Sequence, residues 1–298
     1  PIRYLGRKQC RRSYKKFNIY NCWGILSLQT LKKLSLIGMG RMGKSMVGGW
    51  LNSGLSASKI QIIDPNISIN DKFITENDLS MKSLEEIDST QGTIVIAVKP
   101  QVVENVLIAL RGKLTSETTI ISIIAGYSTK DIRNYIGKAP KLIRTMPNTP
   151  AAIGKGMTAI FSDGALDQNI RSEAEALFSA IGKYCWIEDE DQMHLITAVS
   201  GSGPAYYYLL TECLIEIASS CGLEKNTAAL LVEQTFTGSA ALAETFPNIS
   251  PTQHRQNVTS PGGTTEAALK ILMEDDKLKG LLDLAINSAV ERSKNLSK

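Results

Sequence analysis

In the first half of the chain, short apolar runs alternate with stretches in which apolar residues recur every three or four positions. The short runs are rich in β-branched residues, which favour strands, and the longer spacing is that of an amphipathic helix. Strands that alternate with helices predict a doubly wound α/β domain with a parallel sheet. The predicted strands cover residues 34–37, 60–63, 93–98, 119–124, 141–144 and 157–161, and the predicted helices cover residues 46–51, 102–110 and 128–135.

Beyond residue 165 the strand pattern stops and only helical spacing remains. We therefore expect an α/β domain over residues 34–164 and an all-α domain over residues 165–298. The helix predicted over residues 205–221 is apolar most of the way round, so that it must be buried on several sides. It can be buried within its own domain or at a homodimer interface. The predicted helices of this half cover residues 168–181, 191–199, 205–221, 225–246, 265–273 and 275–294.

The composition excludes several classes of protein. Of the 298 residues, 43% are hydrophobic and 21% are charged, and no apolar run is long enough to predict a membrane span. Five cysteines are scattered without a C-x-x-C pair, which indicates reduced thiols and a cytoplasmic location. The two histidines, His194 and His254, lie far apart and have no ligand partners at suitable spacing, so that no metal site is expected.

The net charge of +4 arises from the first 33 residues, which hold nine lysines and arginines and no acid. The remaining residues carry 24 basic and 29 acidic side chains, a net charge of −5. Because an acidic body binds nucleic acid poorly, we expect no nucleic-acid partner. For residues 1–33, a targeting segment and a basic arm are alternatives to an unstructured extension outside the fold, which we favour.

A G-x-G-x-x-G sequence lies between the first predicted strand and the first predicted helix, at Gly38, Gly40 and Gly43. In this motif the first glycine permits a tight turn, the second lets the backbone approach a pyrophosphate, and the third lets helix and strand pack closely. The pyrophosphate then binds free N–H groups at the helix N-terminus. The strand–turn–helix–strand context predicts a dinucleotide site, and a glycine-rich turn without a ligand is the alternative.

Asp64 follows the second predicted strand, 21 residues after Gly43. A carboxylate at this place accepts hydrogen bonds from a ribose 2′-hydroxyl and repels a 2′-phosphate, and no arginine follows closely. The sequence therefore favours NADH over NADPH. The alternative is that Asp64, Pro65 and Asn66 form only a turn.

Further loops fall where ligands bind in such sheets, outside the carboxyl ends of the strands. Residues 97–100, 125–126 and 146–150 are expected at the same edge as the glycine-rich turn. In the second half, residues 200–204 and 258–265 are loops of small residues next to a predicted helix start. Exposed N–H groups at such helix starts form an anion pocket of the size of a carboxylate, and a plain helix cap is the alternative.

Together these motifs resemble the pyrroline-5-carboxylate reductases, from about residue 34 to residue 298. The resemblance implies a Rossmann-type domain followed by an all-α dimerisation domain. It also implies the last step of proline biosynthesis, in which NADPH or NADH gives a hydride to the C=N bond of 1-pyrroline-5-carboxylate and L-proline is formed. Related β-hydroxyacid dehydrogenases share the first motif but not the last two. The motifs cover residues 37–42, 97–100, 144–150, 200–206 and 258–265.

The resemblance further implies a homodimer, with larger assemblies of dimers left open, and a set of site residues. Thr265 is expected to be the catalytic residue, with its hydroxyl bonded to the ring nitrogen of the substrate. The implied substrate site comprises Glu190, Ser260, Gly262, Gly263, Thr264 and Thr265. The expected cofactor site comprises Ile37, Gly38, Met39, Gly40, Arg41, Met42, Asp64, Ala97, Val98, Lys99, Pro100, Ala125 and Asn257.

A protonated cyclic imine accepts a hydride without a dedicated base, which agrees with two histidines of which neither stands in a catalytic motif. A reductase of another imine or of a 2-hydroxy or keto acid is the alternative. A neutral carbonyl requires a proton donor, and only Lys99 is a candidate. A non-catalytic NAD(P)-binding regulator would require a disrupted loop over residues 258–265, and that loop is intact.

Three positions depart from the family pattern. Asp64 replaces the small or basic residues with which many members accept a 2′-phosphate. His194 stands where an acid is usual, close to Glu190, and His254 stands where an aliphatic residue is common. We interpret both histidines as changes on helix surfaces.

Overall fold

The computed structural model describes residue 28, residues 31–87 and residues 92–296, and the chain divides into two compact units. The first unit runs to Gly201 and resumes at Val290, and the second comprises Ser202–Ala289. Most of the basic extension predicted over residues 1–33 lies outside the described residues.

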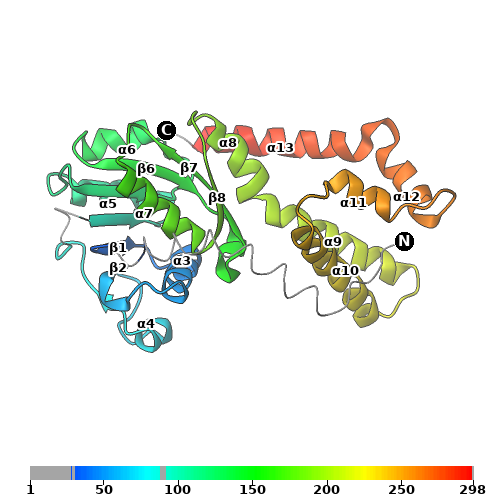
Figure 1. Ribbon diagram of the computed structural model, residues 1–298, viewed down its shortest axis with the longest axis horizontal. Coiled ribbons are helices and arrows are strands. Elements are labelled where there is room, and N and C mark those ends of the chain that lie inside the picture. The colour runs from blue at the N-terminus through cyan, green and yellow to red at the C-terminus, as the bar shows by residue number, and fades with distance from the viewer. Residues whose placement is uncertain (1–27, 29–30, 88–91, 297–298) are drawn as a thin grey trace. The chain divides into compact units, whose positions relative to one another are not determined.

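The first unit is built around an eight-stranded sheet with the strand order β3-β2-β1-β4-β5-β6-β7-β8 (Figure 1). Neighbouring strands are parallel except for β6 and β7, which are antiparallel. The strand order reverses between β1 and β4, which is where doubly wound sheets bind dinucleotides. The strands are β1 (Leu34–Ile37), β2 (Ile60–Ile63), β3 (Ser80–Met81), β4 (Gly92–Ile96), β5 (Thr118–Ser122), β6 (Lys141–Met146), β7 (Gly156–Ser162) and β8 (Gly182–Trp186).

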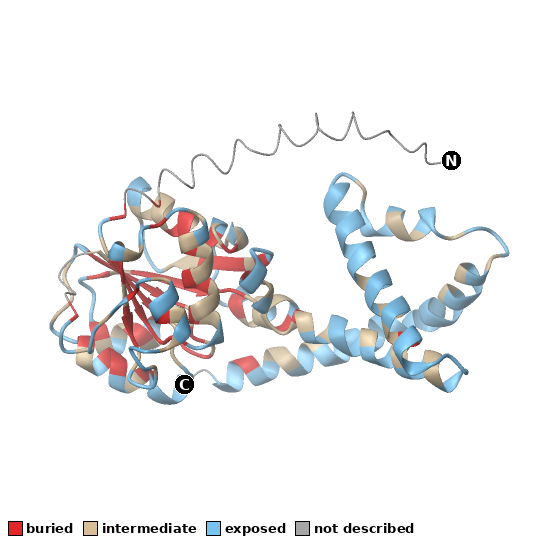
Figure 2. Ribbon diagram, turned by 90° about the horizontal axis from the view of Figure 1, so that it is seen from below, coloured by how far each residue is buried: buried red, intermediate tan, exposed pale blue. Residues whose placement is uncertain are grey.

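Helices cover both faces of this sheet because its central strands are apolar on both sides. On one face, Trp50 of α3 packs with Phe178 of α7, and the Trp50 indole donates to the Leu177 carbonyl at 2.9 Å. Helices α5 and α6 pack on the other face. The strands between the two helical layers are largely buried (Figure 2). The helices are α3 (Arg41–Asn52), α4 (Lys72–Glu76), α5 (Val103–Leu110), α6 (Thr129–Ile136), α7 (Gln168–Ser179) and α8 (Gln192–Ile196).

The second unit is all-helical and has almost no interior of its own. Its α9 packs against α10, yet only Gly203 and Ala228 are buried among its residues. Most residues of this unit are exposed (Figure 2). Large apolar side chains are among them, with Leu230 at 68% and Leu284 at 71%. The helices are α9 (Gly203–Ser220), α10 (Lys225–Thr245), α11 (Pro251–Asn257), α12 (Thr264–Met273) and α13 (Lys277–Leu296), of which α13 continues into the first unit.

The doubly wound fold is confirmed, but the predicted domain boundary falls too early. The all-helical interpretation beyond residue 165 is wrong at β8, which pairs with β7. Lys183 and Cys185 are exposed there while Tyr184 and Trp186 are half-buried, so that the strand signal is a period-two alternation over only five residues. Since β8 belongs to the sheet, the first unit extends past residue 164 to Gly201.

The loop predicted over residues 200–204 is helical instead. A π-helix, η5 (Thr197–Gly201), follows α8, and α9 begins at Gly203. The Asn148 side chain secures this segment by donating to the Ser200 carbonyl at 3.2 Å, while its Oδ1 accepts from the Met157 N–H at 2.8 Å. Ser200 and Gly201 therefore belong to a helix and not to a loop.

Three further observations apply to the described ranges alone. No helix in them has both the length and the hydropathy that a membrane span needs. They contain no group of three or more histidine, cysteine or acidic side chains placed to hold a metal ion. Their cysteines, Cys185, Cys213 and Cys221, are free and exposed.

Candidate active site

The glycine-rich turn after β1 has a backbone conformation that glycine adopts at little cost. Gly38 has a φ of +101°, and a Cβ at this position would lie 2.6 Å from the Ala97 carbonyl oxygen. The Gly38 N–H donates to the Ile63 carbonyl at 2.9 Å. The turn is therefore wedged between the carboxyl ends of β2 and β4.

Helix α3 packs closely on this turn and leaves its N-terminus uncapped. A Cβ at Gly43 would overlap the Gly38 carbonyl oxygen, so that no side chain fits between helix and turn. The N-cap residue Gly40 makes no side-chain hydrogen bond, and a Cβ there would meet nothing within 4 Å. Free N–H groups beside open space fit a pyrophosphate.

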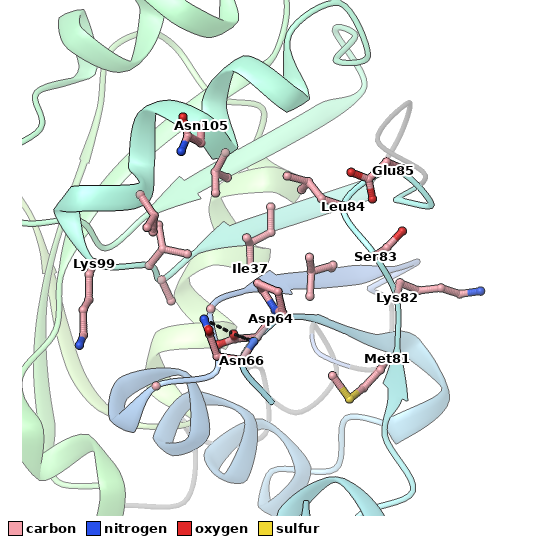
Figure 3. A pocket seen from close by; sticks show the side chains of 18 of the residues that line it. Ile37, Asp64, Asn66, Met81, Lys82, Ser83, Leu84, Glu85, Lys99 and Asn105 are labelled. Carbon is pink, nitrogen blue, oxygen red and sulfur yellow. Dashed lines mark hydrogen bonds between the residues drawn. The ribbon is translucent and has the colours of Figure 1, made fainter. Parts of the chain in front are cut away.

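A cavity of about 820 Å³ opens beside the turn, at the carboxyl ends of β1, β2 and β4 (Figure 3). Seven of the predicted cofactor residues line it, namely Ile37, Gly38, Gly40, Asp64, Ala97, Val98 and Lys99. The lining residues that the sequence did not predict are Ile63, Pro65, Asn66 and Ile69 at and after the end of β2, residues 81–86 at and after the end of β3, and Gln101, Val102, Asn105 and Val106 around the start of α5. The missed segment after β3 follows a strand of two residues, which is too short to give a periodic signal.

The Asp64 carboxylate connects the turn after β2 with the glycine-rich turn. Its Oδ2 accepts the Met39 N–H at 2.7 Å. Its Oδ1 accepts from Asn66, from the backbone N–H at 2.9 Å and from the side-chain amide at 3.3 Å (Figure 3). Asp64 therefore forms the turn that was the alternative to a cofactor contact. A carboxylate has about four acceptor positions, so that these bonds leave room for a ribose hydroxyl.

Further carboxylates line the cavity beyond Asp64. The backbone N–H of Glu85 itself, followed by the Ser83 hydroxyl, lowers the pKa of the Glu85 carboxyl. Hydrogen bonds from Ser83, first from its N–H at 2.8 Å, lower the pKa of Glu86. Both side chains are thereby held ionised, and the lining contains three acidic groups against Lys82 and Lys99.

Several predicted cofactor residues lie outside this lining. The Met39 side chain is only 1% exposed and belongs to the core, although its N–H is held by Asp64. Four others stand at element ends of the first unit: Arg41 and Met42 begin α3, Pro100 begins the short helix η3 (Pro100–Val102), and Ala125 follows β5. The sixth, Asn257, belongs to the second unit.

Glu190, expected at the substrate, binds two other parts of the first unit. Its Oε1 accepts the Thr129 N–H and an Arg144 guanidinium N–H, both at 2.7 Å. Its Oε2 accepts the Thr129 hydroxyl at 2.6 Å. The Arg144 side chain is only 3% exposed. Glu190 is thus the counter-ion of a buried arginine and a cap of α6.

His194 is half-buried and hydrogen-bonded, which differs from the free helix surface that the sequence suggested. Its Nδ1 lies 3.0 Å from the Ser293 hydroxyl on α13. Burial lowers the pKa of His194, and the charges of Arg144 and Lys294 lower it further. The neutral imidazole is therefore the favoured form at neutral pH.

The predicted substrate loop belongs to the second unit, between α11 and α12. The Gly263 N–H donates to the Ser260 carbonyl at 3.0 Å, directly before α12 begins at Thr264. The Gly262 N–H donates to the Glu266 carboxylate at 2.7 Å. One donor of the predicted anion pocket is thus held by a carboxylate of the first turn of α12.

Two predicted or unusual residues lie on α11. Asn257 is the last residue of this helix, and its side-chain oxygen accepts a hydrogen bond from the Gln253 side chain at 2.9 Å. The His254 Nε2 is shielded from solvent and has no hydrogen-bond partner among the described residues. Like His194, His254 is therefore not on a fully exposed helix surface.

Comparisons with known proteins match both halves of the chain. Residues 190–296 match a family model described as pyrroline-5-carboxylate reductase dimerisation, and residues 33–126 match one described as NADP oxidoreductase, coenzyme F420-dependent. A pyrroline-5-carboxylate reductase of Pasteurella multocida is 34% identical over 271 residues, which cover 90% of this chain and 98% of that protein.

Solved structures show the same similarity. A pyrroline-5-carboxylate reductase of Coxiella burnetii has a TM-score of 0.82 and 36% identity, over 90% of this chain and 100% of that one. The Plasmodium falciparum pyrroline carboxylate reductase with NADP bound has a TM-score of 0.77 and 29% identity, over 91% of this chain and 99% of that one.

The close packing of α3 predicts different effects for two glycine substitutions. Gly43→Ala inserts a methyl group against the Gly38 carbonyl, and we expect a loss of about 1–3 kcal/mol of stability together with weaker NADH binding. Gly40→Ala adds its methyl group to the open space where a pyrophosphate would approach. We therefore expect weaker NADH binding and an unchanged melting temperature. Thermal melts and NADH titrations measure both effects. An unchanged melting temperature for Gly43→Ala would contradict the packing argument.

Proposed function

The chain belongs to the pyrroline-5-carboxylate reductase family, and we propose that it reduces 1-pyrroline-5-carboxylate to L-proline with a hydride from a nicotinamide dinucleotide. The observation that supports this most directly is the cavity of about 820 Å³ beside the uncapped start of α3. The loop over residues 258–265, to which the resemblance assigns the substrate, is intact in the same chain. The reaction is the last step of proline biosynthesis.

The residues of the first unit fit a dinucleotide. The N–H groups of Arg41 and Met42 at the start of α3 hold the pyrophosphate, with Gly40 leaving space for its approach. Asp64 accepts the hydroxyls of the adenine-side ribose. Ala97 to Pro100 and Ala125 flank the nicotinamide side, and the expected contact of Asn257 with the dinucleotide stays a prediction. When bound, the dinucleotide supplies the hydride, and the chain supplies position and charge.

The substrate binds at the start of α12 in this proposal. The backbone of Ser260, Gly262, Gly263 and Thr264 holds its carboxylate, and Glu266 releases the Gly262 N–H when that carboxylate arrives. The Thr265 hydroxyl accepts a hydrogen bond from the protonated ring nitrogen. The hydride adds to the imine carbon, the C=N π pair becomes the nitrogen lone pair, and the nitrogen keeps its proton. No general acid is therefore required for the reduction.

We propose NADH as the preferred cofactor. Asp64 would meet the 2′-phosphate of NADPH at the end of β2, and Glu85 and Glu86 add two ionised carboxylates to the same cavity. Like charges that meet in a binding site disfavour the ligand that carries them. Lys82 is the basic residue of the lining segment over residues 81–86 and is the alternative partner for a 2′-phosphate.

We also propose a homodimer formed through the second unit. That unit buries only Gly203 and Ala228 among its own residues, while Leu230 and Leu284 are among many exposed apolar side chains. An apolar surface of this extent marks a protein–protein contact, and closed two-fold assemblies are the commonest solution. The free thiols of Cys185, Cys213 and Cys221 support a reducing compartment, for which we propose the cytoplasm.

The function is tested by initial rates with 1-pyrroline-5-carboxylate, using NADH and NADPH in parallel. We expect substrate-dependent oxidation of both cofactors, with a higher kcat/KM for NADH. Open-chain keto acids should give no comparable rate. If neither cofactor is oxidised by 1-pyrroline-5-carboxylate, the proposed function is wrong.

Replacing Asp64 should change the cofactor preference. Asp64→Ser removes the negative charge from the cavity, and we expect the ratio of kcat/KM for NADPH to that for NADH to rise about tenfold or more, equivalent to ~1.4 kcal/mol. Glu117→Gln is the control, since it also removes an acid but lies before β5, at the sheet edge opposite to the cavity. A ratio that is unchanged in Asp64→Ser would show that Asp64 does not select the cofactor.

Replacing Thr265 should lower the reaction rate with the substrate and leave cofactor binding unchanged. Thr265→Ala leaves a ring N–H without its acceptor. We expect kcat/KM for 1-pyrroline-5-carboxylate to fall by a factor that corresponds to ~1–3 kcal/mol of lost transition-state stabilisation, while the Kd for NADH stays the same. Thr252→Ala, at an exposed position on α11, is the matched control. Unaltered kinetics in Thr265→Ala would refute the catalytic role.

Light scattering tests the dimer. We expect twice the chain mass of 32.5 kDa at micromolar concentration. Leu230→Glu should weaken the dimer because it places a charge on the apolar surface, whereas Ile108→Glu, at an exposed apolar position of the first unit, should not. A monomeric wild-type chain would exclude the proposed assembly.

A further inference from the structure

The Glu190 cluster, which comprises Glu190, Arg144 and Thr129, joins three separate parts of the first unit. Glu190 stands before α8, Arg144 lies in β6, and Thr129 is the first residue of α6. All three of its hydrogen bonds are 2.6 to 2.7 Å long, and one of them is an ion pair with a buried guanidinium. Short charge-assisted bonds of this kind hold backbone segments in fixed geometry.

The cluster lies beside the turn over residues 123–128, which follows β5. Thr129 comes directly after this turn, where Ser128 caps α6 and exchanges hydrogen bonds with Asp131. At its other end, the Ile123 N–H donates to the Ile96 carbonyl at 3.1 Å, one residue before Ala97 of the cofactor cavity. In the middle, a Cβ at Gly126 would lie 2.8 Å from the Leu296 carbonyl of α13. The turn is therefore fixed at both ends and supported in the middle.

The position of this turn suggests which half of the dinucleotide it serves. The cavity lies at the ends of β1, β2 and β4 and is lined by Asp64, where the proposed function puts the adenine-side ribose. A dinucleotide crosses the point of strand reversal, so that its other half extends over the ends of β4 and β5. The turn over residues 123–128 follows β5 at that edge.

We propose that Glu190 is a positioning residue for the nicotinamide half of the cofactor, which it controls by fixing the turn over residues 123–128 through Thr129. This inference rests on the proposed function. It differs from the expectation that Glu190 contacts the substrate, and it rests on the three hydrogen bonds that Glu190 accepts within the first unit.

The burial of Arg144 explains why a carboxylate is needed at this place. The Arg144 side chain is 3% exposed and its Nε has no hydrogen-bond partner among the described residues. Glu190→Gln keeps one acceptor oxygen for Thr129 but leaves this guanidinium without its counter-ion. A buried charge without a partner is strongly unfavourable, so that the surrounding segments must rearrange.

Binding measurements with NADH and with ADP-ribose, which lacks the nicotinamide, separate the possible roles of Glu190. In Glu190→Gln we expect the Kd for NADH to rise about tenfold and the Kd for ADP-ribose to stay within about twofold of wild type. Thr129→Val, which removes a single hydrogen bond to Glu190, should shift the NADH Kd in the same direction by a smaller factor. Glu188→Gln, at an exposed position in the same loop, is the control and should bind both ligands as wild type does.

Three results would overturn the inference. Equal weakening of NADH and ADP-ribose binding in the folded variants would mean a general structural role. An unchanged NADH Kd with a raised KM for 1-pyrroline-5-carboxylate would mean that Glu190 contacts the substrate. No change in either ligand would mean no role. Because these titrations need no turnover, a wild-type protein that binds NADH but does not reduce the substrate would overturn the proposed function separately.

Discussion

The close approach of α3 to the carboxyl ends of β1 and β4 is the constraint on which the cofactor edge depends. Gly38 can take its positive φ and lie against the Ala97 carbonyl only because it has no side chain, and Gly43 lets the helix pack on the Gly38 carbonyl. This packing brings the uncapped N-terminus of α3 to the cavity that Asp64 lines. The contacts that stabilise the fold therefore also create the site.

The sequence predicted this region well because its signals are local. A strand, a glycine-rich turn, a helix and a second strand follow one another within about thirty residues, and each has its own pattern of apolar positions or glycines. The roles expected of Gly38 and Gly43 agree with the contacts that their backbones make. Asp64 was identified as well, although its bond to the Met39 N–H could not be read from spacing.

Contacts between distant parts of the chain could not be predicted from these local signals. The hydrogen bonds from Glu190 to Thr129 and Arg144 span 61 and 46 residues, and no local sequence pattern at either end predicts the partner. The β8 strand was missed because it lies at a sheet edge, where five residues with alternating exposure look no different from a loop. Apolar spacing showed that α9 needs partners, but it could not show that the second unit buries so little of its own surface.

We propose that the charge at the Asp64 end of the cavity matches a ribose hydroxyl and not a phosphate. Calorimetric titration of the wild-type protein with ADP-ribose and with 2′-phospho-ADP-ribose, at one ionic strength, tests this without any contribution from the nicotinamide or the substrate. We predict that ADP-ribose binds about tenfold or more tightly than its 2′-phosphorylated form. Equal or tighter binding of the phosphorylated form would contradict the account, because the cavity would then hold a phosphate despite its three carboxylates.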